Sequence, residues 1–135
     1  MAAEFSMSRR IQFAETDMAG VLHFSNYFRL MEEVEHAFWR SLGLTVYMRE
    51  RDPHLSWPRV SVQCEYFAPL RFEDEVKLHF VVTKIGSKSL HYDVEFLRGE
   101  ERCARGKATA VCCKTDAGGL FEAMAIPDEI RSRLQ

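Results

Sequence analysis

The chain has 135 residues, which suits a single domain over residues 1–135 that is large enough to bury a hydrophobic core. Hydrophobic residues make up 47% of it and charged residues 28%, a composition that excludes a disordered chain. The formal net charge of -2 provides no field that would hold a nucleic acid, and no apolar run approaches the ~20 residues needed to cross a membrane.

The first half of the chain predicts one strand and one long helix. Residues 7–14 alternate loosely and indicate a strand, whereas residues 24–42 indicate a helix because apolar positions recur every three or four residues. Ser25 is a candidate N-cap of this helix, and Gly43 stands where a left-handed residue would end it. The apolar face consists of Phe24, Tyr27, Phe28, Met31, Val34, Phe38 and Leu42.

The second half predicts four strands and a short closing helix. Residues 59–67, 75–84 and 89–97 alternate, residues 102–114 complete the fourth run, and residues 127–134 form the helix. Short turns between the last three strands favour antiparallel hairpins. The predicted fold class is α+β, with an antiparallel sheet of about five strands wrapped around one long central helix. Because such a sheet has free edges, we expect a homodimer or a homotetramer.

Cysteines, histidines and the N-terminal residues bear on location and cofactors. Cys64, Cys103, Cys112 and Cys113 show no CxxC spacing, and we interpret them as reduced core or strand residues. The five histidines show no pair at ligand spacing, so no metal is expected. The first ten residues lack the apolar stretch of a secretion signal, which indicates a cytoplasmic protein.

The stretch FAETDMAGVLHFSNYF, residues 13–28, places an acid, a glycine and a histidine just before the long helix. Asp17, with a reference pKa of ~3.9, would be ionised at neutral pH and able to attack a carbonyl or activate a water. Free N–H groups where the helix begins near Phe24 could bind the substrate and stabilise its carbonyl oxygen. Gly20 would allow a sharp turn between Asp17 and the helix and would let the substrate approach. Alternatively, Asp17 and Gly20 are simply turn residues.

Three further residues of this stretch are candidates for the site. His23 could serve as a base or hydrogen-bond donor, or it could be a core histidine with its hydrogen bonds satisfied. Asn26 and Tyr27 could contact a substrate. Because Tyr27 also lies on the apolar face of the helix, we expect it to pack in the core.

The sequence resembles a known family in three places. The segment TDMAGVLHFSNYFRLMEEVEHAFWRSLGL, the segment YFAPLRFEDEV at 66–76 and SKSL at 87–90 are similar to the hot-dog-fold acyl-CoA thioesterases of the 4-hydroxybenzoyl-CoA thioesterase family. The resemblance implies hydrolysis of a thioester between coenzyme A and an acyl group at a subunit interface, with no other cofactor. It also implies that Asp17 is the catalytic carboxylate, as nucleophile or general base. The chain has Glu15 where the family usually has aspartate, and family members differ at the position of His23.

The resemblance also implies contacts with coenzyme A. Lys88 and Ser89 match positions that contact its pantetheine or phosphates, although a lysine in a hairpin turn is often only solvated. Arg59, Arg71 and His91 are further candidates that the sequence does not rank.

Glu33 lies where some related enzymes carry a helix acid, and one hot-dog design uses a helix glutamate as its catalytic group. Since Asp17 is present, we interpret Glu33 as part of a solvated helix face that it shares with Glu32.

The leading hypothesis is an acyl-CoA thioesterase in which Asp17 acts on a carbonyl held near the helix N-terminus. The alternative is a hot-dog protein that binds acyl-CoA or acyl carrier protein without turnover, and loss of Asp17 would be its expected mark. A hydratase of the same fold normally needs an Asp and His pair in a different local motif. The acyl group stays open, because aromatic residues around Phe24, Tyr66 and Phe67 suit an aryl or an alkyl pocket.

Overall fold

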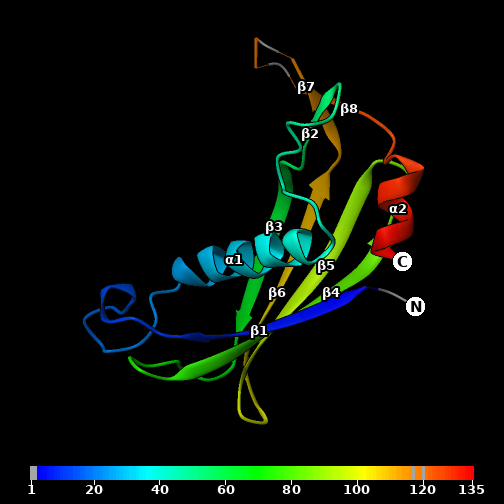
Figure 1. The fold of residues 1–135 in the computed structure, drawn as a ribbon. Helices are drawn as coiled ribbons and strands as arrows, with labels where there is room; N and C mark the ends of the chain where they lie inside the picture. The colour runs from blue at the N-terminus through cyan, green and yellow to red at the C-terminus, as the bar shows by residue number, and fades with distance from the viewer. Residues whose placement is uncertain (1–2, 117, 120) are drawn as a thin grey trace.

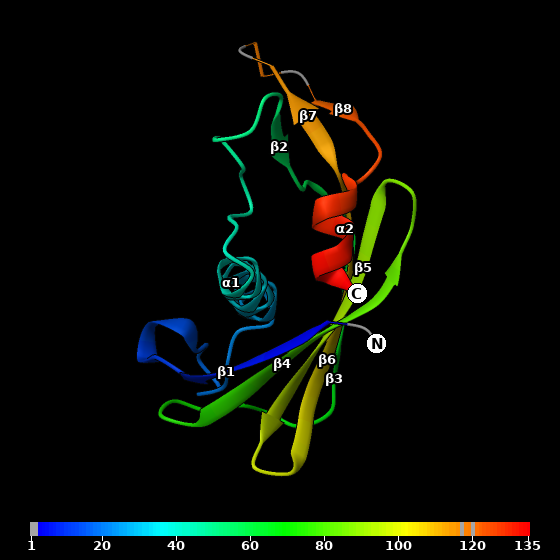
Figure 2. The same cartoon turned by 45° about the vertical axis from the view of Figure 1, so that its right-hand side comes forward.

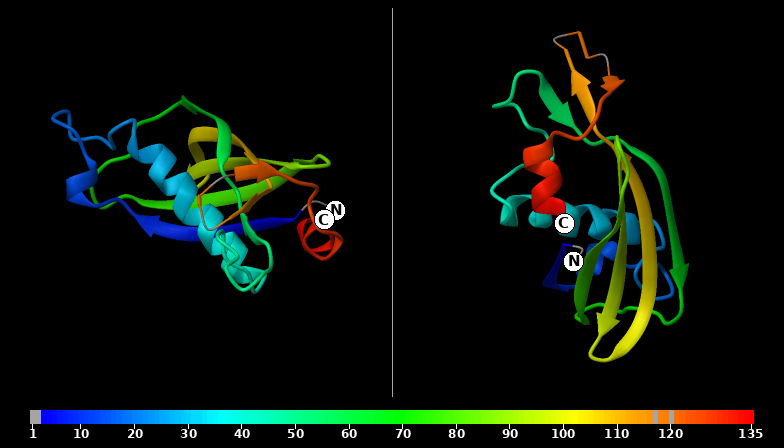
Figure 3. Two further views of the ribbon diagram at one scale, coloured as in Figure 1. Left: turned by 90° about the horizontal axis from the view of Figure 1, so that it is seen from above. Right: turned by 90° about the vertical axis from the view of Figure 1, so that its right-hand side faces the viewer.

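A five-stranded antiparallel sheet curves around the helix α1, Asn26–Ser41, in the computed structural model, which describes residues 3–116, 118–119 and 121–135 (Figure 1). The strand order is β1-β4-β5-β6-β3. Figures 2 and 3 show that α1 crosses the concave face of this sheet, which confirms the predicted α+β architecture. The strands are β1 (Glu4–Arg10), β3 (Arg59–Tyr66), β4 (Glu75–Ile85), β5 (Ser89–Arg98) and β6 (Glu101–Val111).

Small residues on β6 allow α1 to approach the sheet closely. The inner face of β6 carries Ala104, Gly106, Ala108 and Ala110, all buried. A Cβ atom on Gly106 would lie 2.4 Å from the sulfur of Met31, so any other residue here would require the Met31 side chain to shift. The remaining buried residues of α1 are Tyr27, Leu30, Val34, Glu35, Phe38 and Trp39.

The ends of α1 differ in how well they were predicted. The helix begins at Asn26, two residues later than expected, because residues 24–25 form a turn. Ser25 occupies the cap position but makes no side-chain cap bond, since its hydroxyl is bonded to His23 Nδ1 at 2.7 Å. Gly43 has φ of +77°, as predicted for the left-handed residue after a helix.

The first strand lies earlier in the chain than predicted. It spans residues 4–10 and not 7–14, and Phe13–Glu15 instead form a short 3-10 helix, η1. A reciprocal capping box between Gln12 and Glu15 stabilises this turn, and it ends the strand before the predicted boundary.

A second, three-stranded sheet was not predicted. It has the order β2-β7-β8 and lies beyond one end of the main sheet (Figure 1). The predicted strand 102–114 is therefore divided between β6 and β7. The predicted closing helix is confirmed as α2 (Asp128–Leu134), and Ala3 N donates to Leu134 O at 3.3 Å, which holds the two chain ends together. The strands of the second sheet are β2 (His54–Ser56), β7 (Cys113–Thr115) and β8 (Phe121–Ala123).

The cysteines and the helices settle two points about the described chain. All four cysteines are free thiols, and all but Cys64 are buried, which confirms their interpretation as reduced core or strand residues. None of the described helices is both long and apolar enough to span a membrane.

Candidate active site

A tight turn holds Asp17 between η1 and α1. Asp17 N donates to Val21 O at 2.9 Å, and Gly20 N donates to Asp17 O at the same distance. Gly20 has φ of +81°, a conformation that glycine adopts without strain. The sharp turn predicted at this glycine is confirmed.

The two oxygens of the Asp17 carboxylate have different surroundings. Oδ1 accepts the backbone N–H groups of Ala19 at 2.9 Å and Val21 at 3.4 Å, a bonding pattern typical of aspartate in turns. No described residue donates to Oδ2. The turn explanation of Asp17 is thus correct, and it leaves one oxygen available for chemistry.

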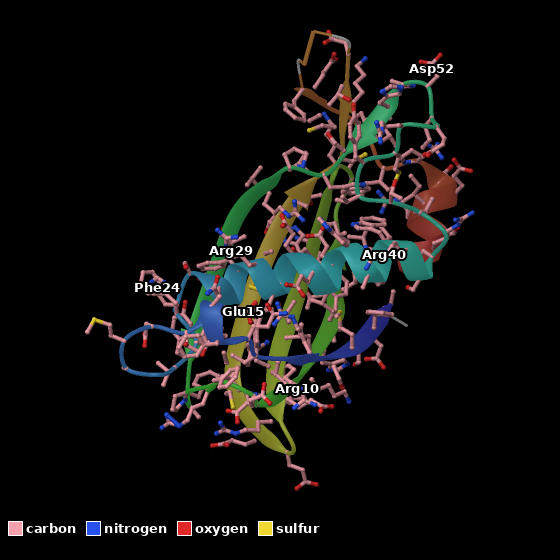
Figure 4. All side chains as sticks on the ribbon, turned by 60° about the vertical axis from the view of Figure 1, so that its left-hand side comes forward. Arg10, Glu15, Phe24, Arg29, Arg40 and Asp52 are labelled. Carbon is pink, nitrogen blue, oxygen red and sulfur yellow. The ribbon has the colours of Figure 1, made fainter. Side chains whose placement is uncertain are left out.

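Asp17 lines a groove of about 380 Å³ with largely aromatic walls. Tyr27 and Tyr66 meet edge to face with ring centroids 4.8 Å apart, and the Tyr66 hydroxyl donates to Phe24 O at 3.3 Å. Phe24 and Phe67 also line the groove. Phe24 is 64% exposed, and Figure 4 shows it beside Glu15 at the N-terminal end of α1.

The backbone N–H of Phe24 differs from its neighbours. The N–H groups at positions 22–23 and 25–26 each have an acceptor. Within the described part of the chain, no acceptor takes the N–H of Phe24. A donor without an acceptor therefore stands on a residue of the same groove as Asp17.

The other residues predicted from this stretch have mainly structural contacts. His23 is half-buried, is not among the groove-lining residues, and stacks on Phe24 at 4.6 Å. The Asn26 side-chain amide donates to Glu15 O at 2.8 Å, which ties the helix start to η1. Tyr27 is only 3% exposed, so its predicted packing in the core is confirmed. Burial raises the pKa of Tyr27 to about 12.

Arg9 on β1 is bonded to Glu15 of η1 and Glu33 of α1, the two elements on either side of the Asp17 turn. Its Nη1 donates to Glu15 at 2.7 Å, and its Nε donates to Glu33 at 3.1 Å. The Glu33 side chain is 42% exposed, which agrees with the expected solvated helix face, and it also pairs with Arg9. The hydrogen bonds that Arg9 donates lower the pKa of Glu15, and the same bonds to Glu15 and Glu33 raise the pKa of Arg9.

The predicted coenzyme A contacts lie elsewhere in the chain. Lys88 belongs to the turn between β4 and β5 and Ser89 begins β5, beside α2, whose Arg131 donates to Gly86 O at 2.8 Å. Neither residue lines the Asp17 groove, and their contact with coenzyme A stays a prediction. Among the described residues, no group of three or more His, Cys, Asp or Glu side chains is arranged to hold a metal.

The three unranked candidates for contact with coenzyme A lie in different parts of the fold. Arg71 pairs with Val21 in an isolated β-bridge beside the Asp17 turn. His91 on β5 is bonded to Ser89 and Thr109 through its two ring nitrogens. Arg59 instead donates to Glu35 on α1.

Sequence reasoning missed Glu35, a buried acid with 0% exposure. The available signal was its position on the helix, four residues after Met31 and four before Trp39, which places it on the buried stripe. The acid is therefore part of the core and not of the solvated face.

These features define a class of protein with an α+β fold, one helix across a curved sheet, and an apolar groove lined by both a carboxylate residue and a residue with an unpaired backbone amide. Comparisons with known proteins agree. Residues 11–134 match the model of the Thioesterase-like superfamily. A curated Aquifex aeolicus protein, provisionally named an esterase, is 32% identical over 126 residues, covering 93% of this chain and 94% of that protein.

Two solved structures show the same fold. A gentisyl-coenzyme A thioesterase has a TM-score of 0.82 and 26% identity, covering 96% of this chain and 98% of its own. A 1,4-dihydroxy-2-naphthoyl-CoA thioesterase from Synechocystis has a TM-score of 0.85 and 20% identity, covering 98% and 96%. The chain belongs to the thioesterase-like superfamily and has the hot-dog fold, which confirms the family resemblance seen in the sequence.

Proposed function

We propose that this protein is an acyl-CoA thioesterase that converts a thioester and water into a carboxylic acid and coenzyme A. The observation that supports this most directly is that one groove is lined by two residues with free polar groups. Asp17 has a carboxylate oxygen, Oδ2, without a donor, and Phe24 has a backbone N–H without an acceptor. The N–H stabilises the negative charge that develops on the carbonyl oxygen. The curated and solved relatives named as acyl-CoA thioesterases support the reaction type.

Asp17 acts in one of two ways. As a general base, Oδ2 takes a proton from a water whose oxygen attacks the thioester carbonyl, the C–S bond breaks, and the thiolate takes up the proton. As a nucleophile, Oδ2 attacks the carbonyl itself, coenzyme A leaves, and water hydrolyses the resulting anhydride. In both routes the N–H bonds to Oδ1 keep the carboxylate in place.

The proposed assembly is a homodimer or homotetramer with the site between subunits. Support comes from β3, which is an edge strand of the main sheet and exposes Val60 and Val62 along its length. Lys88 and Ser89 are proposed to contact coenzyme A, and His23 to assist catalysis. A reducing, cytoplasmic location is consistent with four free thiols.

The test is release of coenzyme A thiol from a panel of aromatic and aliphatic acyl-CoA esters by the wild type and Asp17→Asn. Asparagine keeps an oxygen for the turn bonds at Ala19 and Val21 but is not a base, so kcat should fall by about a hundredfold or more while the melting temperature changes little.

Asp52→Asn is the matched control, because Asp52 is exposed and lies far from Phe24 in Figure 4. Its activity should equal that of the wild type. Hydrolysis by Asp17→Asn at the wild-type rate would refute the role of this carboxylate. If the wild type binds acyl-CoA esters but hydrolyses none, the protein is instead a binding protein.

A further inference from the structure

A buried polar network joins α1 to the edge of the sheet. Glu35 Oε1 accepts from Arg59 Nη2 at 2.6 Å and from the Tyr92 hydroxyl at 2.6 Å, and Trp39 Nε1 donates to the other oxygen at 3.2 Å. Burial and the neighbouring Glu35 raise the pKa of Tyr92, which keeps the phenol a donor. Because a buried acid is costly unless it is fully bonded, this network holds Arg59 in one position.

A β-bulge aims Arg59 at this network. Arg59 pairs with Ala110 of β6, and Ser61 pairs with Thr109, so Val60 is an extra residue on β3. Val62 lies on the inner face, where it lines a cavity against α1. Without the extra residue, Arg59 would lie three positions from Val62 and its side chain would point to the outer face of the sheet. Bulges that redirect a side chain are common beside functional sites.

Arg59 stands between two cavities. One, of about 170 Å³, lies against Phe28 and Met31 of α1, and the other, of about 370 Å³, lies against Trp57. Arg59 lines both, and it is the only cation among the described residues that line either one. Its Nε and Nη2 are bonded to Glu35, while Nη1 has no acceptor within hydrogen-bond distance among the described residues.

The larger cavity also collects unpaired polar groups. In the described part of the chain, the buried side-chain atoms without a hydrogen-bond partner are Ser56 Oγ, Trp57 Nε1 and Thr115 Oγ1. All three residues line this cavity. Each of these atoms can donate a hydrogen bond, and all three are buried in the cavity wall.

The charges around Arg59 select the kind of acceptor. Glu35 offsets the guanidinium, and Glu32 Oε2 lies 3.9 Å from Nη1. The surroundings therefore carry more negative than positive charge, which disfavours an anion. A neutral oxygen, such as a hydroxyl, ether or ketone, can accept from Nη1 without this penalty.

The position of Arg59 on β3, a free edge strand, indicates whether it can act with Asp17 of its own chain or with Asp17 of a second copy. Arg59 and Tyr66 lie at opposite ends of β3, about 23 Å apart along the strand, too far for one small acyl group. If two copies pair antiparallel through β3, centred on Gln63, Val62 of one copy lies opposite Cys64 of the other, and the bulged pair Arg59 and Val60 lies opposite Tyr66. Tyr66 lines the groove that contains Asp17.

We propose that Arg59 of one copy completes the Asp17 site of a second copy and selects acyl groups that carry a neutral hydrogen-bond-accepting oxygen. This inference rests on the thioesterase function and the dimer proposed above. It assigns Arg59 as a specificity-determining residue and Glu35 as its positioning residue.

The first experiment compares kcat/KM for benzoyl-CoA, 4-hydroxybenzoyl-CoA and 4-carboxybenzoyl-CoA. The wild type should prefer the hydroxylated ester over the unsubstituted one by about tenfold or more, and should disfavour the carboxylated ester. Hydrolysis of all three at equal kcat/KM would overturn the inference while leaving the thioesterase function intact.

The second experiment uses a variant that keeps the charge balance, Glu35→Gln/Arg59→Met, which should lose the preference for the hydroxyl group. The matched control is Asp93→Asn/Arg105→Met, because this 2.6 Å ion pair lies on the outer face of the sheet. The control should keep the wild-type preference. A preference retained by Glu35→Gln/Arg59→Met would refute the role of Arg59.

The third experiment tests the contribution between copies. Asp17→Asn and Glu35→Gln/Arg59→Met are unfolded and refolded together with 4-hydroxybenzoyl-CoA as the substrate. Half of the dimers should then be mixed, each with one intact site, which restores activity to about one quarter of the wild type. Activity no greater than the mean of the two variants alone would place Arg59 outside the partner's site.

Measurements of acyl-CoA binding test the role of Arg59 even if the protein proves not to be a thioesterase. Both tryptophans of the chain report on the cavity of about 370 Å³ that Arg59 lines, because Trp57 lines it and the rings of Trp57 and Trp39 lie 4.9 Å apart, so a change in their fluorescence measures binding there. Asp17→Asn should bind 4-hydroxybenzoyl-CoA about tenfold or more tightly than benzoyl-CoA, and removal of Glu35 and Arg59 should abolish the difference. Equal affinities for the two esters would overturn the inference without any measurement of turnover.

Discussion

In the proposed mechanism, Asp17 serves a turn and a reaction at the same time. Its Oδ1 accepts two backbone N–H groups, as in many surface turns, and its Oδ2 has no donor among the described residues. The two explanations of the motif were alternatives in the sequence because a one-dimensional pattern does not separate the two oxygens. In the structure they are complementary, since the turn fixes the orientation that the chemistry needs.

Gly20 provides a test of the turn alone. Its φ is +81°, and a Cβ atom added to it would meet no other atom within 4 Å, so Gly20→Ala should suffer backbone strain but no clash, at a cost of about 1–2 kcal/mol. Gly20→Asn should cost less, because asparagine tolerates this conformation better. Urea denaturation of the two variants measures the difference. Equal stability of Gly20→Ala and the wild type would show that the turn relaxes elsewhere.

Among the elements, the ion pairs of Arg9 hold the loop between β1 and α1. Glu15 and Arg9 are mostly buried, with side-chain exposures of 17% and 14%, and Glu15 also accepts the N–H of Gln12. By contrast, the pair Arg10–Glu75 spans 3.4 Å and is more than half exposed. The first pair should therefore contribute more to stability than the second.

Glu15→Gln should lower the free energy of unfolding by about 1–3 kcal/mol at pH 7, whereas Glu75→Gln should cost about 0.5 kcal/mol or less. The hydrogen bonds from Arg9 lower the pKa of Glu15 in the folded state from its usual 4.5. Its contribution is therefore complete above that unfolded value and is lost as the pH falls through the lower folded value. Urea titrations at pH 7 and pH 3 should show the gap between wild type and Glu15→Gln closing in acid.

The sequence predicted the long elements and missed the short ones for physical reasons. The period of α1 extends over more than four turns, so the helix was found with its C-terminal glycine. Strands β2, β7 and β8 have three residues each, too few for any alternation to be visible. They form because they pair with one another, which is a contact between distant segments.

Within the candidate site, too, the residues close together in sequence were predicted and those brought together by the fold were not. Asp17, Gly20 and Phe24 were predicted because they are close together in sequence and one local turn positions them. Arg59 was only an unranked candidate and Glu35 was missed, since their contact joins a helix to a strand 24 residues away through a bulge. Local patterns do not contain that information.

At the scale of the whole molecule, the free edge of β3 is the feature that the single chain leaves unexplained. Val62 is 48% exposed although it is apolar and lies in the middle of the strand. Arg59 and Tyr66, which lie on the same face of β3 near its two ends, line two different pockets. Antiparallel pairing with a second copy would cover Val62. At each end of the paired strands, the Arg59 pocket of one copy would then lie next to the Asp17 groove of the other.

Val62→Lys tests this arrangement, because two lysines close to the two-fold axis would repel each other and be removed from water. We expect the dimer to weaken by about a hundredfold or more, measured by sedimentation velocity across a concentration series. Ser8→Lys on β1, the opposite edge strand, is the matched control and should leave the dimer unchanged. If Val62→Lys remains dimeric at the concentrations at which the wild type does, the copies do not meet through β3. If it becomes monomeric and loses thioesterase activity while keeping its helix and sheet content by circular dichroism, the catalytic site requires both copies.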